Sequence, residues 1–201
     1  MELVLVRHAL PVRIDETHDG SPADPGLAGL GRRQAERVLE ALAHDETNHL
    51  YSSPAARALE TAAPLVDQLD LPLSIAPGIA EFDAEESSYV PVEELRAAND
   101  PRWQALVSGD ITAGSVDPDE FKKRVIVAIE EIVDRHPGGR AVLFTHSGVI
   151  NAYAGHVSGQ DRLLWCAPDY ASLTRIGAAR DGRRGLISLN ETGHVRDLLT
   201  R

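Results

Sequence analysis

The chain has 201 residues, of which 43% are hydrophobic and 25% are charged, and its formal net charge is −11. This length fits one well-buried α/β domain better than two. So acidic a chain is expected to be repelled by nucleic acid and by anionic membrane surfaces, and no apolar run reaches the roughly 20 residues that span a bilayer. Neither nucleic acid nor a membrane is therefore expected as a partner.

The start of the chain and its cysteine content bear on where the protein works. Residues 1–7 hold a short apolar run without a basic leader, which predicts a buried strand and not a signal peptide. Cys166 is the single cysteine, so no internal disulfide can form, as is usual in a reducing compartment. We expect a cytoplasmic protein, either a monomer or a homodimer.

Short apolar runs alternate with stretches of helical periodicity, the pattern of a mostly parallel sheet covered by helices. The runs that predict strands lie at residues 3–6, 50–52, 73–76 and 141–145. Helical apolar stripes lie at residues 35–42, 58–69 and 121–133, and a further helix is expected at 148–156. Two later runs, at 172–176 and 186–189, flank Asp181-Gly182 and predict an antiparallel hairpin at the sheet edge.

Two helix starts and one insertion can also be predicted. Ser53 is expected as an N-cap with Pro54 at the first helical position, and Asp117 as the N-cap of a later helix. Residues 83–116 are rich in Asp, Glu, Ser and Pro and show little periodicity, which predicts a small helical cap within a single domain spanning residues 1–201. Trp103 within the cap is expected to be a packing anchor, as is Trp165, and the alternative for the region near Trp103 is that it lines the mouth of the pocket.

Polar residues follow three of the expected strands. Arg7 and His8 end the first strand, Arg57 lies in the first turn of the helix after the second, and His146 ends the central strand. Ligands gather at the carboxyl ends of strands in open α/β sheets, so these side chains converge if the strands are parallel neighbours. Two arginines can hold phosphate oxygens in bidentate fashion, which predicts a phosphate site at this edge.

Four segments in order along the chain resemble the signatures of the histidine phosphatase superfamily, also called the phosphoglycerate mutase-like family. They are Leu5-Val6-Arg7-His8-Ala9, the stretch from Asp24 to Ala35, the stretch from Ser52 to Ala62, and the stretch from Val142 to Ile150. The resemblance covers most of the chain. It implies a phosphoglycerate mutase-like α/β fold, a three-layer sandwich with a mostly parallel central sheet and helices on both faces.

The resemblance also implies a role for each matching position. His8 would be the nucleophile and would pass through a phosphohistidine intermediate. Glu81 matches the general acid, which would protonate the leaving oxygen and then activate the water that cleaves phosphohistidine. The residues that would bind the phosphoryl group are Arg7, Arg57 and His146, all three also catalytic, together with Ser147. No metal or other cofactor is implied, because the arginines and His146 supply the positive charge.

The sequence departs from the family pattern at a few positions. Ala9 stands where glycine is usual, which requires a negative φ there, and Ser147 stands where a glycine often follows the second histidine. The segment 10–20 lacks the familiar polar pattern and leaves the identity of the substrate open. The acid is also open to alternatives, namely Asp83, Glu85 and Glu86.

The activity that we predict is metal-independent hydrolysis of a phosphomonoester, through phosphohistidine, on a small phosphorylated metabolite. One alternative is phosphoglycerate mutase-type phosphoryl transfer, which uses the same residues but must retain the phosphate and exclude water. A second is a non-catalytic phospho-ligand-binding protein on the same scaffold. The presence of both His8 and Glu81 favours an enzyme, because a binding protein needs neither a nucleophile nor an acid.

Overall fold

A single mixed sheet forms the centre of the molecule, which a computed structural model describes over residues 1–108 and 116–199. Within these ranges its strands are β1 (Glu2–Arg7), β2 (His49–Ser52), β3 (Leu73–Ile75), β4 (Arg140–Thr145), β5 (Leu173–Ala178) and β6 (Arg184–Glu191). Their order across the sheet is β3-β2-β4-β1-β5-β6. The first four strands are mutually parallel, and β5 and β6 form the predicted antiparallel hairpin beside β1.

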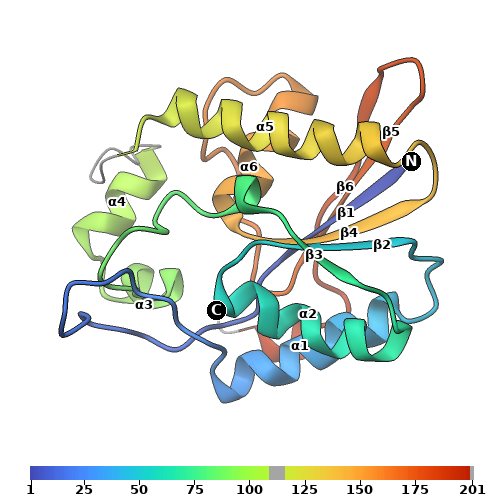
Figure 1. Cartoon of the computed structure of the whole chain (residues 1–201). Coiled ribbons are helices and arrows are strands. Elements are labelled where there is room, and N and C mark those ends of the chain that lie inside the picture. The colour runs from blue at the N-terminus through green and yellow to red at the C-terminus, as the bar shows by residue number, and fades with distance from the viewer. Residues whose placement is uncertain (109–115, 200–201) are drawn as a thin grey trace.

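Helices cover both faces of the sheet, as predicted (Figure 1). They are α1 (Gly29–Leu42), α2 (Ala56–Leu69), α3 (Val92–Ala97), α4 (Pro101–Ser108), α5 (Pro118–Arg135) and α6 (Ser147–Ser158), with short 3₁₀ turns η1 (Pro77–Ile79) and η2 (Arg196–Leu198). In Figure 1, α1 and α2 lie below the sheet, α5 and α6 lie above it, and α3 and α4 lie together at one end. None of the helices in the described ranges has the length and apolar character needed to cross a membrane.

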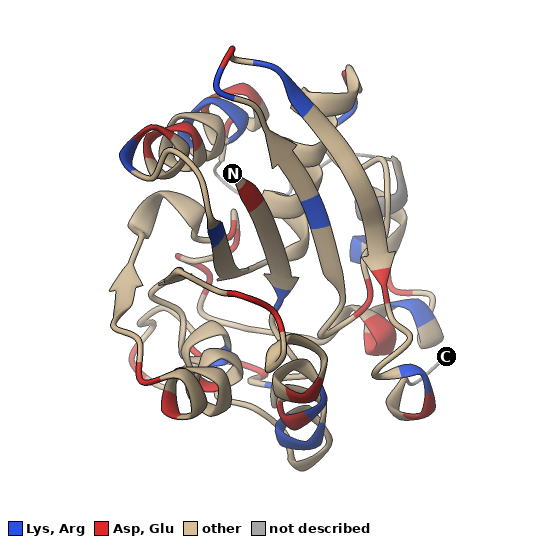
Figure 2. Ribbon diagram, turned by 90° about the vertical axis from the view of Figure 1, so that its right-hand side faces the viewer, with Lys and Arg blue, Asp and Glu red and all other residues tan. Residues whose placement is uncertain are grey.

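Two apolar cores hold the layers together. Successive residues of a strand point to opposite faces of the sheet. Leu3 and Leu5 of β1 therefore pack with α5 and α6, whereas Val4 and Val6 pack with α1 and α2. Burying each such side chain contributes roughly 1.5–3 kcal/mol. In Figure 2 most of the length of each strand carries no charged residue, whereas the helices carry many.

The two predicted helix starts have different outcomes. Asp117 is the N-cap of α5 as expected, and its Oδ1 accepts a hydrogen bond from the amide of Asp119 at 2.8 Å. The prediction for Ser53 and Pro54 is wrong, because α2 begins at Ala56 and its N-cap residue makes no side-chain cap. The amide of Ala56 instead donates to Asp24 Oδ1 at 2.8 Å, so this helix is capped by a residue distant in the sequence.

Several other boundaries move slightly. The third strand ends at Ile75 and not at residue 76, and α6 begins one residue earlier than predicted and continues to Ser158.

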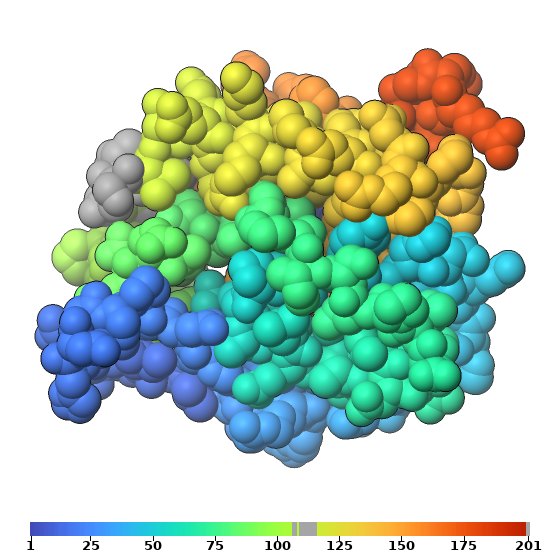
Figure 3. All heavy atoms as spheres, viewed as in Figure 1, coloured from blue at the N-terminus to red at the C-terminus, as the bar shows by residue number. Residues whose placement is uncertain are grey.

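The cap helices α3 and α4 lie against the segment between β1 and α1. Ile14 and Tyr89 exchange backbone hydrogen bonds of 2.9 and 2.7 Å, and Arg13 reaches Glu94 of α3 at 3.0 Å. Figure 3 shows residues 10–22, in dark blue, lying against the green cap. Residues 109–115 of the predicted cap segment lie outside the described residues. The contacts place α3 close to the loop that follows His8.

Candidate active site

The strand order places three chemically unusual loops side by side. β2, β4 and β1 are adjacent and parallel, so their carboxyl ends meet at one edge of the sheet. His8 follows β1, His146 follows β4 and Ser53 follows β2. The rings of His8 and His146 lie 5.1 Å apart between centroids, and the amide of His8 donates to the carbonyl of Thr145 at 2.8 Å.

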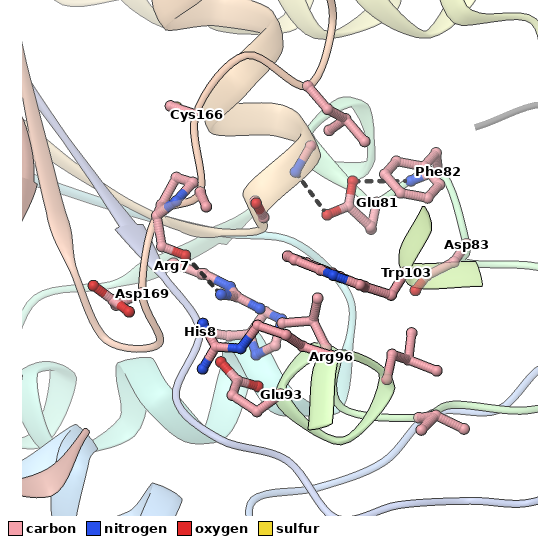
Figure 4. Close-up of a pocket in the computed structure, with 18 of the residues that line it drawn as sticks. Arg7, His8, Glu81, Phe82, Asp83, Glu93, Arg96, Trp103, Cys166 and Asp169 are labelled. Atoms are coloured by element: carbon pink, nitrogen blue, oxygen red, sulfur yellow. Dashed lines mark hydrogen bonds between the residues drawn. The ribbon is translucent and has the colours of Figure 1, made fainter. Parts of the chain in front are cut away.

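A pocket of about 430 Å³ opens over this edge (Figure 4). The residues predicted for the site that line it are Arg7, His8, Arg57, Glu81 and Ser147. His146 is fully buried and does not line the pocket itself, but lies against His8. The remaining walls come from the cap and from the loop of residues 159–172 between α6 and β5.

His8 is held as a neutral ring with one free nitrogen. Its Nδ1 lies 2.9 Å from the carbonyl oxygen of Ala9, and because a carbonyl can only accept, Nδ1 carries the proton. Nε2 therefore keeps a lone pair. Burial, together with the positive charge of Arg57, holds the pKa of His8 well below its usual value, so the ring is uncharged at neutral pH.

Ser53 orients the second histidine. Its Oγ lies 2.7 Å from Nε2 of His146, and both side chains are completely buried. The other ring nitrogen, Nδ1, has no hydrogen-bond partner in the described part of the chain. Burial is also the main reason why the pKa of His146 lies well below its usual value. The residue that the sequence suggested as a helix cap thus holds the ring of His146 in place.

The two site arginines are buried and lie against aromatic rings. Arg7 donates to the carbonyl of Pro168 at 2.6 Å, and its guanidinium carbon lies 3.7 Å from the centroid of Tyr170. Arg57 donates to Asp83 Oδ1 at 3.2 Å and lies 4.8 Å from the ring centroid of Tyr89. Cation–π contact with a ring face stabilises each charge without neutralising it.

Glu81 is a buried acid whose carboxylate accepts hydrogen bonds only from backbone amides within the described ranges. Its Oε2 accepts from the amide of Gly148 at 2.9 Å and its Oε1 from the amide of Phe82 at 3.1 Å. Burial, and then the nearby charge of Asp83, raises the pKa of Glu81 to about 7. The carboxyl group is therefore able to give and take a proton near neutral pH. Asp83 differs from Glu81 in having a charged side-chain partner, because its carboxylate forms an ion pair with Arg57.

The segment that carries Glu81 is tied to the sheet and to α5. Thr145 at the end of β4 donates from Oγ1 to the carbonyl of Ile79 at 2.9 Å. Arg124 of α5 donates to the carbonyl of Ala80 at 3.0 Å and to two carbonyls of the η1 turn. These hydrogen bonds fix the backbone immediately before Glu81.

The positions that depart from the family pattern fit this arrangement. The backbone of Ala9 is not among those with positive φ in the described ranges, and its amide donates to Thr61 Oγ1 at 2.9 Å. Ser147 is half-buried as the first residue of α6. Arg13 pairs with Asp15 and Glu94 and does not line the pocket.

Several contributors to the pocket were not predicted. Tyr89 and Tyr170 support the arginines, and no pattern in their flanking residues marks them for this. Trp103 and Trp165, expected as packing anchors, both line the pocket, which the sequence suggested only for the region near Trp103. Trp165 is also fixed by a hydrogen bond from Nε1 to the carbonyl of Asn151 at 3.1 Å. The alternative acids Glu85 and Glu86 are not among the lining residues.

The residues gathered at this edge of the sheet are suited to one class of reaction. Two fixed guanidinium groups, a neutral imidazole with a free Nε2 and an acid that titrates near neutrality suit transfer of a phosphoryl group to nitrogen. In the described ranges, no group of three or more His, Cys, Asp or Glu side chains is arranged to hold a metal ion.

Comparison with known proteins identifies the family. Residues 3–192 match the model of the histidine phosphatase superfamily (branch 1). A phosphoglycerate mutase-like protein 4 of Arabidopsis thaliana is 30% identical over 161 residues, which are 75% of this chain and 68% of the relative. Phosphoserine phosphatase 1 of Hydrogenobacter thermophilus is 26% identical over 206 residues, covering 97% of this chain and 94% of the relative.

The fold is also found among solved structures. A mycobacterial glucosyl-3-phosphoglycerate phosphatase, solved with inorganic phosphate, superposes with a TM-score of 0.74 at 22% identity, covering 96% of this chain and 99% of its own. The predicted fold class is therefore confirmed, and so is the predicted enzyme class, a phosphatase. The chain belongs to the histidine phosphatase superfamily, branch 1.

Proposed function

We propose that the chain hydrolyses phosphomonoesters of small metabolites and carries the phosphoryl group on Nε2 of His8. The observation that supports this best is the 2.9 Å contact between His8 Nδ1 and the carbonyl of Ala9, which leaves the lone pair on Nε2. The ring is also neutral, because burial and the charge of Arg57 lower its pKa. A neutral imidazole is the nucleophilic form.

In the first step, Nε2 of His8 forms a bond to phosphorus and the bond from phosphorus to the ester oxygen breaks. Glu81, with a pKa of about 7, gives its proton to the departing oxygen. The residues proposed to hold the phosphoryl oxygens and stabilise their charge are Arg7, Arg57, His146 and Ser147. The products of this step are the free alcohol and phosphohistidine.

In the second step, the carboxylate of Glu81 takes a proton from water while the water oxygen attacks phosphorus. The bond from phosphorus to Nε2 breaks and inorganic phosphate leaves. Because Nδ1 of His8 keeps its proton throughout, the ring returns to its neutral starting state. Glu81 is again protonated, so the cycle closes without an external acid or base.

The relatives suggest which esters to assay first. O-phosphoserine is the substrate class named for the Hydrogenobacter thermophilus relative, and glucosyl-3-phosphoglycerate is that named for the mycobacterial structure. Both are small phosphorylated acids. We propose that the substrate is a phosphorylated metabolite at least as large as these.

The test is phosphate release from p-nitrophenyl phosphate and from these two esters. The wild-type chain should release phosphate in the presence of a strong chelator, and vanadate, a mimic of five-coordinate phosphorus, should inhibit. His8→Ala should abolish release from every ester. Activity that is lost on chelation and restored by Mg²⁺ or Zn²⁺ would overturn the mechanism.

Mutase activity is the second candidate, because the relative at 30% identity is named as phosphoglycerate mutase-like. A mutase returns the phosphoryl group to a second acceptor, so it would convert 3-phosphoglycerate into its 2-phospho isomer with little release of phosphate. A non-catalytic binding protein would form no phosphohistidine at all. Measuring isomer, phosphate and phosphoenzyme in one reaction separates the three.

We also propose the setting in which this activity takes place. Residues 83–116 act as a cap on one domain that spans the chain, and α3 and α4 supply part of the pocket wall. The cytoplasm as location and a monomer or homodimer as assembly stay predictions from the sequence.

A further inference from the structure

Beyond the phosphoryl site, the pocket has an apolar outer wall. Its apolar lining residues include Leu95 and Trp103 of the cap, Leu164 and Trp165 of the loop of residues 159–172, and Phe82 beside the proposed acid. In Figure 4 the indole of Trp103 lies across the middle of the pocket, between Glu81 and Arg96. Large aromatic faces of this kind favour contact with a carbon body and not with a small hydrated acid.

The size of the pocket agrees with this. A volume of about 430 Å³ lies within the range of pockets that hold drug-sized ligands, which begins at about 300 Å³. A three-carbon phosphoacid would leave most of the aromatic wall in contact with water. The binding energy available from that wall is realised only if the alcohol half of the substrate covers it.

Two arginines of the same wall have no ion-pair partner. Arg96 of α3 and Arg162 line the pocket, and in residues 1–108 and 116–199 no carboxylate oxygen lies within 4.0 Å of either guanidinium. Figure 4 shows Arg96 extending from its helix into the pocket. Two nearby arginines do have ion-pair partners: Arg13, in the segment between β1 and α1, pairs with Glu94 at 3.0 Å, and Arg102 of the cap pairs with Asp100 at 2.9 Å.

Two carboxylates, those of Asp169 and Glu93, also line the outer wall. Asp169 accepts a hydrogen bond from Asn190 Nδ2 at 3.0 Å. Glu93 lies near Arg7: burial alone would lower the pKa of Arg7, but Tyr170 and Glu93 together raise it. In the described ranges neither carboxylate lies within 4.0 Å of Arg96 or Arg162, so both guanidinium groups are available to an anionic group of the substrate.

We propose that the alcohol half of the substrate has an apolar body larger than a three-carbon acid and carries a second anionic group, a carboxylate or a phosphate, which Arg96 and Arg162 bind. This inference rests on the proposed phosphatase function and names the substrate class for the same pocket. Arg96 and Arg162 are the specificity-determining residues. Trp103 and Trp165 contact the body between the two anionic ends.

The test uses four esters: O-phosphoserine, phenyl phosphate, 2-naphthyl phosphate and a 2-naphthyl phosphate with a carboxylate on the far ring. The wild-type chain should have a lower KM for the naphthyl than for the phenyl ester, and the highest kcat/KM for the carboxylated naphthyl ester. Arg96→Ala and Arg162→Ala should each lower the ratio of kcat/KM for the carboxylated over the plain naphthyl ester by about tenfold. Because the ratio for the same two esters is compared between variants, the difference in leaving-group acidity between the esters cancels.

Arg102→Ala is the matched control, since it removes the same charge from the cap but does not line the pocket. It should leave the ratio unchanged. Phosphate release with the same ratio in Arg96→Ala, Arg162→Ala and wild type overturns the anion-binding role, and the highest kcat/KM for O-phosphoserine overturns the apolar body. No release from any ester by the folded chain would overturn the proposed function, and this inference with it.

Discussion

Glu81 contacts the first turn of α6 through Gly148, whose amide donates to its Oε2 at 2.9 Å. The contact is close enough to exclude a side chain on Gly148: a Cβ there would collide with Glu81 Oε1 and would lie 2.8 Å from Cδ1 of Phe82. Helix amides stabilise a carboxylate, whereas burial destabilises it, and here burial has the larger effect on the pKa. The position of the proposed acid thus depends on the absence of one methyl group.

Gly148→Ala should therefore displace Glu81 without touching His8. We expect phosphoryl transfer from an alkyl ester to slow by about 10²-fold, the lower end of the usual effect of general acid catalysis. Gly29→Ala is the control, because a Cβ at Gly29 meets no atom within 4 Å. Thermal unfolding shows that both variants are folded, and single-turnover rates compare them. Equal rates in Gly148→Ala and wild type would contradict the placement of the acid.

Glu81→Gln should separate esters by their leaving group. An alkoxide is a poor leaving group and needs a proton, whereas p-nitrophenolate is already stable, so alkyl esters should be slowed by about 10²–10⁴-fold and aryl esters much less. Rapid-quench measurement of phosphoenzyme isolates this step, because Glu81 is also the proposed base in the second one. Similar slowing of both esters would remove Glu81 from the acid role and leave Asp83 as the candidate.

The rate of phosphoenzyme formation from an alkyl ester should fall as pH rises above about 7. Burial first, and Asp83 second, raises the pKa of Glu81 to about 7, so the proton needed for the leaving oxygen is lost above that pH. Titration of the nucleophile should cause no change in this rate near neutral pH, because the pKa of His8 lies well below its usual value. Asp83→Asn removes a nearby negative charge and should move the falling limb to lower pH; a limb that stays in place contradicts the coupling.

Arg57→Ala should lower the rate of phosphoryl transfer by roughly 10²–10³, as is usual when one fixed donor to a developing anion is lost. Arg57→Lys should recover only part of this, because an ammonium group cannot reproduce the planar pair of donors. Arg33→Ala on α1, which removes an exposed arginine that does not line the pocket, serves as the control. The Arg57 hypothesis fails if kcat/KM in Arg57→Ala equals that of the control.

A pair of stacked histidines far from the pocket should make the fold sensitive to acid. The rings of His49 and His136 lie 3.5 Å apart, and Tyr51 Oη lies 2.6 Å from His136 Nε2. Burial, and then the charge of His49, lowers the pKa of His136 in the folded state. The unfolded chain therefore binds more protons below pH 6.5, and the free energy of unfolding falls as pH drops through that value.

His49→Gln removes the like charge and should make that loss of stability shallower. Urea unfolding at pH 7 and pH 5 measures the difference, and His44→Gln, at an exposed histidine in the turn after α1, is the control. If both variants lose stability with the same slope, the stacked pair is not responsible.

Much of the fold can be predicted from the sequence, because its strands carry unambiguous patterns. β1 and β4 are buried along almost their whole length, and their sequences are continuous apolar runs. Asp117 is likewise predictable, because it caps the helix that begins at the next residue. Ser53 shows where such reasoning stops. Its place before Pro54 is that of a helix cap, yet its hydroxyl binds His146, 93 positions away, and Asp24 caps the helix instead.

The same limit applies to the pocket. Arg7, His8 and Arg57 stand in recognisable local patterns, so their proximity could be anticipated from a parallel sheet. Tyr170 lies beneath Arg7 only because β5 runs antiparallel beside β1, and nothing adjacent to it in sequence records that contact. The pKa of Glu81 likewise depends on burial by distant elements.

The anchoring of the segment before Glu81 has a consequence for how such an enzyme could diversify. Thr145 and Arg124 bind the carbonyls of Ile79 and Ala80, so the acid is fixed by the sheet and by α5. The chain that follows, over residues 84–108, supplies Trp103 and Arg96 to the outer wall. Mutations in that segment can therefore alter substrate preference while the reaction centre stays intact. A graft of the corresponding segment from a relative should transfer preference between esters and leave hydrolysis of p-nitrophenyl phosphate in place.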